Sequence, residues 1–301
     1  METEAESKGR EMATGPVSRV GVVGCGLMGS GIAEVCAKAG LDVMVREINP
    51  AAMEAGQKRL TASLDRALGA NKITEDERDS ALSRLSFTTD LADFADRQLV
   101  VEAVIEDEGL KTEVFSHLDK YVEDDNAILA TNTSSIPVMK LGMATQRPSQ
   151  VVGVHFFNPV PVLKLVELVP SLLTSSDTIT RAVDFAEGTL HKKVIRSNDR
   201  AGFIVNALLV PYILSAVRMM ESGYASAEDI DLGMVEGCAH PMGPLRLADL
   251  IGLDTIVAIA ESLYAEFKEP LYAAPPLLSR MVDAGLLGRK AGRGFYDYAK
   301  K

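Results

Sequence analysis

The chain has 301 residues, of which 47% are hydrophobic and 24% charged, so its composition excludes a disordered protein and allows a substantial core. The formal net charge is −11 and no Lys- or Arg-rich run occurs, which argues against a nucleic-acid partner. The three cysteines form no CxxC or Cys/His pattern, so we expect a reducing compartment and no metal site. Chains longer than about 250 residues usually divide, and we therefore expect two domains.

The N-terminal residues 1–16 are polar and acidic, without the apolar stretch of a signal peptide or the arginines of a transit sequence. We interpret them as a flexible tail and expect a cytoplasmic protein. The run 202–220 is long enough to span a membrane, but Asn206, Pro211, Ser215 and Arg218 interrupt it. We therefore predict a helix buried inside a domain or a dimer, and no membrane association.

From Val17 to about Arg196, short β-branched runs alternate with amphipathic stretches, a pattern typical of parallel strands joined by right-handed crossovers. Helical spacing predicts a helix over 28–38 that ends before Gly40, and another over 107–121. Thr74 and Glu77 form a capping box that predicts the start of a further helix. The pattern indicates a Rossmann-type, doubly wound, mostly parallel sheet in a domain of residues 17–200. The predicted strands are 19–23, 43–46, 99–103, 128–131, 151–155, 164–169 and 193–196.

After residue 200 the strand-like runs disappear. Four or five helices are predicted, separated by turns at Gly223, 241–244, Gly252 and 275–276. Residues 201–301 are therefore expected to form a smaller, all-helical domain.

A glycine-rich turn follows the first predicted strand directly and opens a helix, which is the context that a dinucleotide-binding fingerprint requires. Gly24 permits the tight turn, Gly26 lets the backbone approach a pyrophosphate, and Gly29 lets the helix pack close to the strand. Leu27 and Met28 complete this cofactor-binding segment. The alternative is a tight turn that holds no ligand.

An acidic residue, Glu47, ends the second predicted strand, where it can accept hydrogen bonds from an adenosine ribose diol. This favours NAD as the cofactor. Arg46 lies beside it, and a guanidinium there can pair with a 2′-phosphate, so NADP stays open.

Polar residues follow three later strands, at 102–106, 132–135 and 155–159, and parallel strands would bring them to one edge of the sheet. His155 is the candidate base for removing a proton from an alcohol, because an imidazole titrates near working pH. The other three histidines, His117, His191 and His240, are expected to be solvated or to cap helices. By position alone, His155 has an equal chance of being a hydrogen-bonded structural residue.

Two further polar residues lie in apolar surroundings and require partners. If a turn brings the strands of His155 and Glu167 side by side, the carboxylate can fix the tautomer of the imidazole. The alternative partners for Glu167 are Lys164 and solvent. Asn206 can orient a substrate carbonyl or tie its helix to the first domain, and the residues alone do not decide between these roles.

Several short motifs occur in one order along residues 17–298. They are the glycine-rich run 24–33, Thr131-Asn132-Thr133-Ser134-Ser135, the run Gly-Val-His-Phe-Phe-Asn-Pro-Val-Pro at 153–161, Gly-Phe-Ile-Val-Asn at 202–206, Pro-Met-Gly-Pro at 241–244 and Gly-Arg-Gly-Phe-Tyr at 292–296. On these motifs the chain closely resembles the 3-hydroxyacyl-CoA dehydrogenase family, and within it the bacterial short-chain 3-hydroxybutyryl-CoA dehydrogenases.

The resemblance implies reversible hydride transfer between a nicotinamide dinucleotide and the 3-hydroxy or 3-keto group of a short-chain acyl-CoA, in fatty-acid or butanoate metabolism. It also implies a homodimer formed through the helical domain. Glu47 departs from the aspartate that the family often has there. The implied roles are acid/base for His155, its partner for Glu167, substrate hydrogen bonding for Ser134 and Asn206, and cofactor contacts for Glu47, Ala103, Glu106, Lys111, Asn132 and Asn158.

Two other classes of protein share this plan. A 3-hydroxy acid or 6-phosphogluconate dehydrogenase would rely on a lysine early in the helical domain, but no lysine occurs between Lys193 and Lys268. A non-catalytic nucleotide-binding protein would be expected to lack the set His155, Glu167 and Asn206, all of which are present.

Overall fold

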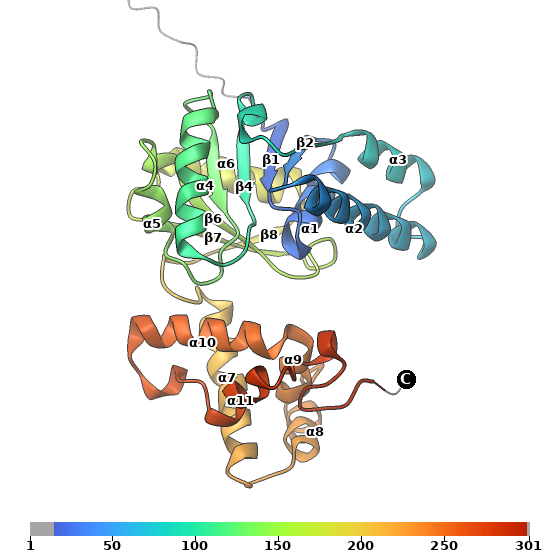
Figure 1. Cartoon of the computed structure of the whole chain (residues 1–301), viewed down its shortest axis with the longest axis vertical. Coiled ribbons are helices and arrows are strands. Elements are labelled where there is room, and N and C mark those ends of the chain that lie inside the picture. Colours follow the sequence, from blue (N-terminus) through green and yellow to red (C-terminus); the bar gives the residue numbers. More distant parts are fainter. Residues whose placement is uncertain (1–14, 300–301) are drawn as a thin grey trace, which may run out of the picture. The chain divides into compact units, whose positions relative to one another are not determined.

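The computed structural model describes residues 15–299, which form two compact units. The first contains the chain up to Thr133 together with Val138–Arg196, and the second contains Ser134–Pro137 and the chain from Ser197 onward. Figure 1 shows a sheet with helices in the first unit and helices in the second. Most of the tail expected at residues 1–16 lies outside the described residues.

The first unit is built on an eight-stranded sheet of order β3-β2-β1-β4-β5-β6-β7-β8. Every neighbouring pair is parallel except β6 and β7. The Rossmann-type, mostly parallel sheet is thus confirmed. The strands are β1 (Arg19–Val23), β2 (Asp42–Arg46), β3 (Leu85–Thr88), β4 (Leu99–Glu102), β5 (Ile128–Thr131), β6 (Val151–Phe156), β7 (Leu165–Pro170) and β8 (Lys193–Arg196).

The central strands β4, β5 and β6 are buried along their whole length, which is why they consist largely of Val, Ile and Leu rather than of alternating polar and apolar residues. β3 pairs with β2 at the edge of the sheet and is only partly buried. This strand was not predicted from the sequence, because four residues just after a helix carry too little periodicity.

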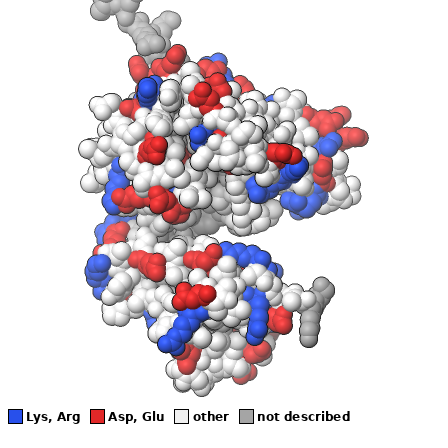
Figure 2. All heavy atoms as spheres, in the orientation of Figure 1, with Lys and Arg blue, Asp and Glu red and all other residues white. Residues whose placement is uncertain are grey.

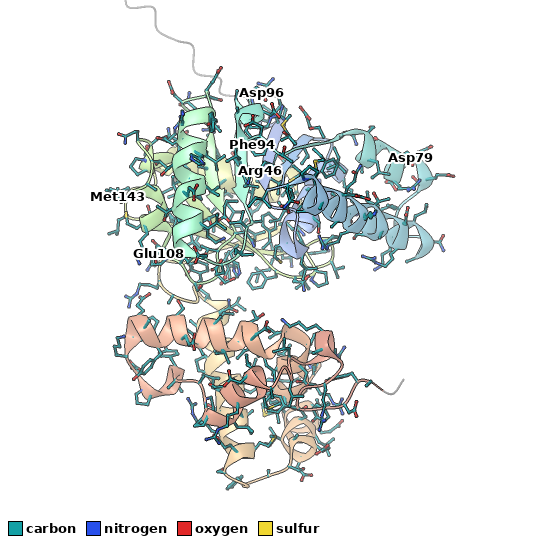
Figure 3. The ribbon with its side chains drawn as sticks, in the orientation of Figure 1. Arg46, Asp79, Phe94, Asp96, Glu108 and Met143 are labelled. Atoms are coloured by element: carbon teal, nitrogen blue, oxygen red, sulfur yellow. The ribbon has the colours of Figure 1, made fainter. Side chains whose placement is uncertain are left out.

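Helices cover both faces of the sheet (Figure 1). The capping box predicted at Thr74 and Glu77 is confirmed at the start of α3. The short helical turn Leu91–Phe94 packs on β1, since a Cβ at Gly21 would lie 2.6 Å from the ring of Phe94, which is labelled in Figure 3. The helices are α1 (Leu27–Lys38), α2 (Pro50–Gly69), α3 (Glu75–Ser83), α4 (Glu108–Tyr121), α5 (Val138–Gly142) and α6 (Ser176–Val183), the last continued by a π-helical turn over Asp184–Thr189.

The second unit has its own apolar core, formed mainly by α7, α9 and α10. The predicted helix at 202–220 is present as α7 but begins at Val205. Within residues 15–299, no helix is long and apolar enough to cross a membrane. The helices are α7 (Val205–Glu221), α8 (Ala227–Cys238), α9 (Pro244–Ile251), α10 (Leu253–Phe267) and α11 (Pro276–Asp283).

Two buried aspartates explain the sequence motifs near the C-terminus. The Asp249 carboxylate accepts hydrogen bonds from the backbone N–H groups of Phe295 and Tyr296, both at 2.9 Å. A Cβ at Gly294 would lie 1.9 Å from the Asp249 carboxylate, so only glycine fits there. Asp231 accepts the Tyr296 hydroxyl at 2.7 Å. The terminal segment is therefore held on the helices by two carboxylates.

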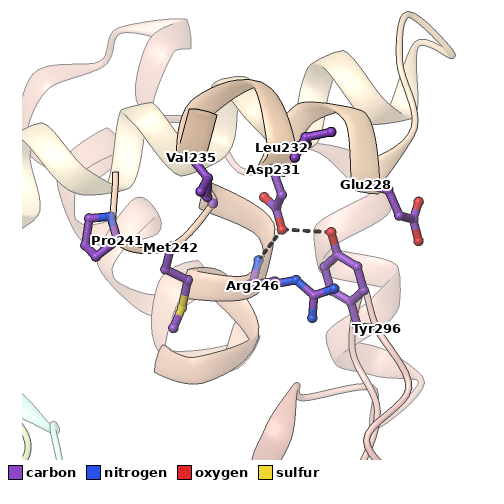
Figure 4. A pocket seen from close by; sticks show the side chains of 9 residues that line it. Glu228, Asp231, Leu232, Val235, Pro241, Met242, Arg246 and Tyr296 are labelled. Carbon is purple, nitrogen blue, oxygen red and sulfur yellow. Dashed lines mark hydrogen bonds between the residues drawn. The ribbon is translucent and has the colours of Figure 1, made fainter. Parts of the chain in front are cut away.

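A cavity of about 420 Å³ opens beside this arrangement (Figure 4). The hydrogen-bonded side chains of Asp231 and Tyr296 line it, and the Arg246 guanidinium lies 3.9 Å from the centre of the Tyr296 ring. Its other lining residues are Glu228, Leu232, Val235, Pro241, Met242 and Gly243.

Acidic and basic side chains are interspersed over each unit on the face that Figure 2 draws. The acidic side chains behind the net charge of −11 thus form no single patch on that face.

Candidate active site

The glycine-rich turn joins β1 to α1 at the carboxyl edge of the sheet. Gly24 has a φ of +91° and a Cβ there would lie 2.8 Å from the carbonyl oxygen of Ala103, so the turn requires glycine. A Cβ at Gly29 would lie 1.9 Å from the carbonyl oxygen of Gly24, which shows how closely α1 packs. Gly26, in contrast, faces open space with nothing within 4 Å. This is the geometry that a pyrophosphate needs to approach the backbone at a helix N-terminus.

Leu27 and Met28 begin α1 directly after this turn. Leu27 is exposed and Met28 is half-buried. Ala103, on the neighbouring loop after β4, is also half-buried. The three residues therefore lie around the turn without closing the space beside Gly26.

Glu47 follows β2 and lies beside the turn. One carboxylate oxygen accepts the Cys25 N–H at 2.5 Å and the other accepts the Ile48 N–H at 3.1 Å. Arg59, from α2, donates to the Cys25 carbonyl oxygen at 2.6 Å. Sequence reasoning missed Arg59, because only the packing of α2 brings it to the turn.

Arg46, labelled in Figure 3, donates to the carbonyl oxygen of Thr89 at 3.3 Å. Its guanidinium is thus bonded to the segment after β3, whereas Glu47 is bonded to the glycine-rich turn itself.

Cys25, inside the turn, is fully buried. Burial, with a smaller contribution from the nearby Glu47 charge, raises the pKa of its thiol to about 11. A thiol with this pKa stays protonated near neutral pH, so Cys25 is a packing residue rather than a nucleophile.

A polar cluster lies where β4 and β5 end, in which Glu102 and Lys111 are buried and Glu106 is exposed. Lys111 of α4 pairs with Glu102 at 2.7 Å and with Glu106 at 3.3 Å. The Thr131 hydroxyl donates to Glu102 at 2.7 Å, and the Thr133 hydroxyl donates to Glu106. The family resemblance implied cofactor contacts for Glu106 and Lys111, whereas Glu102 was placed only among the polar residues after the strand.

Asn132 joins this cluster to β6. Its N–H donates to the carbonyl oxygen of Glu102 at 2.9 Å, and its side-chain oxygen accepts the N–H of Phe156 at 2.8 Å. Asn158 lies two residues beyond β6, is exposed, and precedes a cis peptide bond to Pro159. The side-chain oxygen of Asn132 is therefore bonded within the fold, while Asn158 is exposed.

His155 and Glu167 lie opposite each other on the antiparallel strands β6 and β7. His155 Nδ1 is 2.8 Å from Glu167 Oε2, and the two side chains are 6% and 0% exposed. An ionised carboxylate can only accept, so a carboxylate at this position selects the tautomer of a neutral imidazole that carries its proton on Nδ1 and leaves Nε2 as the basic nitrogen. The turn after β6 thus brings the strands of His155 and Glu167 side by side, which the sequence allowed but did not require.

Ser134 and Asn206 belong to the second unit. Ser134 lies in the segment after β5, and Asn206 is the second residue of α7. Both residues are half-buried. Of the other histidines, His117 is exposed on α4, His191 follows the π-helical turn, and His240 hydrogen-bonds Tyr212 at 3.2 Å. Among the described residues, no group of three or more His, Cys, Asp or Glu side chains could hold a metal ion.

Comparison with known proteins identifies both units. Residues 19–200 match the family model "3-hydroxyacyl-CoA dehydrogenase, NAD binding domain", and residues 202–298 match its C-terminal domain. The chain is 59% identical to the 3-hydroxybutyryl-CoA dehydrogenase of Mycobacterium tuberculosis over 282 residues, which cover 94% of this chain and 99% of that protein. It is 44% identical to the probable 3-hydroxybutyryl-CoA dehydrogenase of Bacillus subtilis, over 95% of this chain and 99% of that protein.

Solved structures agree with these matches. The crystal structure of FadB2 from M. tuberculosis has a TM-score of 0.94 at 59% identity, covering 94% of this chain and 100% of that one. The (S)-3-hydroxybutyryl-CoA dehydrogenase PaaH1 from Ralstonia eutropha has a TM-score of 0.88 at 45% identity, with the same coverage of 94% and 100%. The protein is an oxidoreductase that uses a nicotinamide cofactor, and it belongs to the 3-hydroxyacyl-CoA dehydrogenase family.

Proposed function

We propose that the protein interconverts 3-hydroxybutyryl-CoA and acetoacetyl-CoA. The observation that carries this proposal is the buried pair of His155 and Glu167, on the same sheet edge as the glycine-rich turn. The relatives named for this reaction support the choice of a short acyl chain. When bound, the nicotinamide cofactor accepts a hydride from C3 of the hydroxyacyl group or returns one to the ketone.

In the proposed mechanism, His155 Nε2 takes the proton of the 3-hydroxyl group during oxidation and returns it to the 3-keto oxygen during reduction. Glu167 holds Nδ1–H and stabilises the imidazolium that forms. Because both side chains are buried, water screens this attraction little. Ser134 and Asn206 are proposed to donate hydrogen bonds to the substrate, which their half-buried positions permit.

The residues around the turn fit a dinucleotide, since Gly26 leaves its backbone open and α1 begins there. We propose Gly24, Gly26, Leu27, Met28, Gly29, Glu47, Ala103, Glu106, Lys111, Asn132 and Asn158 as the residues that contact it. The position of Glu47 beside the turn favours NAD, because a carboxylate there accepts a ribose diol and repels a 2′-phosphate. Kd values for NADH and NADPH, measured by fluorescence, test this choice, and tighter binding of NADPH would contradict it.

The first experiment follows the absorbance of reduced nicotinamide while acetoacetyl-CoA is supplied, for the wild type, His155→Ala and the control His117→Ala. We expect rapid turnover by the wild type and by the control, because His117 is exposed on α4. We expect His155→Ala to lose turnover and keep its affinity for NADH. A wild type that binds NADH but does not turn over would favour a non-catalytic nucleotide-binding protein instead.

We also propose a homodimer formed through the helical unit and a cytoplasmic location. Exposed apolar side chains on that unit, among them Leu208, Tyr224 and Leu232, support the dimer. The three free cysteines support a reducing compartment. Light scattering at several protein concentrations tests the dimer, and a monomer mass throughout would contradict it.

A further inference from the structure

Glu102 and Lys111 form an ion pair that is almost completely shielded from solvent. The two side chains are 0% and 1% exposed, and 2.7 Å separates their charged atoms. Burying such a pair is expensive, and apolar residues of similar volume often stabilise a fold equally well. The pair therefore requires an explanation other than stability.

The contacts of Glu102 supply one. Besides Lys111, its carboxylate accepts the N–H of Val104 at 2.7 Å and the hydroxyl of Thr131 at 2.7 Å. These partners come from the loop after β4, from α4 and from the end of β5. One carboxylate thus fixes three segments at the carboxyl edge of the sheet.

This fixation continues toward the candidate catalytic strand. Asn132, next to Thr131, donates its N–H to the Glu102 carbonyl oxygen and accepts the N–H of Phe156, the neighbour of His155. The Glu102 carboxylate therefore holds Lys111 directly and reaches Asn132 through the neighbouring Thr131, so its loss would loosen two of the proposed cofactor contacts and, through Asn132, the end of β6.

We propose that Glu102 is a positioning residue of the dinucleotide site, which acts by orienting Lys111 and Asn132. The inference rests on the proposed function. The buried carboxylate of Glu102 then controls the affinity for the dinucleotide, although it does not reach solvent itself.

The test measures the Kd for NADH by fluorescence, and Tm, for Glu102→Gln and for a matched control, Arg147→Met. The Arg147 guanidinium donates hydrogen bonds to the Asp119 carboxylate and to the carbonyl oxygens of Val122 and Asp124, at the C-terminal end of α4. Loss of these bonds should also lower Tm. We expect Glu102→Gln to weaken NADH binding tenfold or more, Arg147→Met to leave the Kd within twofold of wild type, and Glu102→Asp to recover part of the affinity.

Steady-state kinetics supply a second readout that a merely structural role would not move. We expect Glu102→Gln to raise KM for NADH and to leave KM for acetoacetyl-CoA unchanged. If this variant does not fold, Thr131→Val replaces it, because that change removes one of the three hydrogen bonds and keeps the ion pair.

The outcomes separate the two proposals. A wild type that turns over acetoacetyl-CoA, together with variants that bind NADH as tightly as the wild type, overturns the role of Glu102 and leaves the proposed function intact. Equal weakening by Glu102→Gln and Arg147→Met also overturns it, since loosening of α4 would then explain the effect. A wild type that does not bind NADH overturns the proposed function and this inference together.

Discussion

Replacing Glu167 by glutamine removes one negative charge beside His155 and keeps the size and planar shape of the side chain. The carboxylate lies 2.8 Å from His155 Nδ1, and both side chains are buried. An amide oxygen can still accept the Nδ1–H hydrogen bond. The variant therefore isolates what the charge contributes to the imidazolium that forms during proton transfer.

The size of this contribution follows from Coulomb's law. Two unit charges about 4 Å apart attract by about 4 kcal/mol at the effective dielectric constant of about 20 that suits protein sites. Each 1.36 kcal/mol in the barrier corresponds to about a tenfold change in rate. We expect Glu167→Gln to lower kcat by about 10³-fold if the proton is fully transferred in the transition state, and by about 30-fold if it is half transferred.

The assay is the reduction of acetoacetyl-CoA at saturating NADH, with Glu113→Gln as the control because Glu113 is exposed on α4. The Kd for NADH should stay unchanged in both variants. A decrease in kcat of less than about tenfold for Glu167→Gln would show that the charge does not stabilise the transition state, and would refute the electrostatic role of this residue.

Three further predictions concern the turn, a buried charge and the C-terminal segment. Gly26→Ala should keep the wild-type Tm and lose affinity for NADH, whereas Gly29→Ala should also lower Tm, because its Cβ meets the Gly24 carbonyl oxygen at 1.9 Å; equal Tm values for the two variants would contradict this. Burial raises the pKa of the Glu34 carboxyl above its usual value of 4.5. The folded state therefore loses stability relative to the unfolded state as the pH rises above 4.5 and this carboxyl has to ionise. Glu34→Gln should therefore raise Tm at neutral pH and lose this gain below pH 4.5, and a gain that does not depend on pH would contradict it. Tyr296→Phe removes a donor from buried Asp231 and should destabilise the protein by about 1–3 kcal/mol in urea unfolding; an unchanged midpoint would show that water replaces the bond.

Most of the sheet could be predicted from the sequence, because buried parallel strands leave a strong local signal. The β-branched runs of β1, β4 and β5 are short, continuous and bounded by turns, and their predicted limits differ from the structure by one residue at most. β3 was missed because it is short, half-buried and at the edge. The direction of β7 was not predicted either, although the connection between β6 and β7 is too short for the crossover that a parallel pair requires.

The candidate site, like the sheet, could be predicted only in part from the sequence. The glycine-rich turn and the polar residues after each strand are visible in the sequence, because their spacing reflects local backbone geometry. The contacts of Glu102 and the position of Arg59 were not predicted, because they join segments that are far apart in the chain or depend on how α2 packs. A buried carboxylate at the end of an apolar strand was the one available signal for Glu102, since such a group requires a partner.

The His155–Glu167 pair depends on the register of β6 and β7 as much as on the two residues. Successive side chains of a strand point to opposite faces, so a slip of one residue would turn Glu167 away from the face that His155 occupies. The register is fixed by the length of the connection between the strands and by the Lys192 ammonium, which donates to the carbonyl oxygens of Val160 and Leu163 within it. The chemistry of the proposed acid/base therefore depends on a loop whose residues need not touch the substrate.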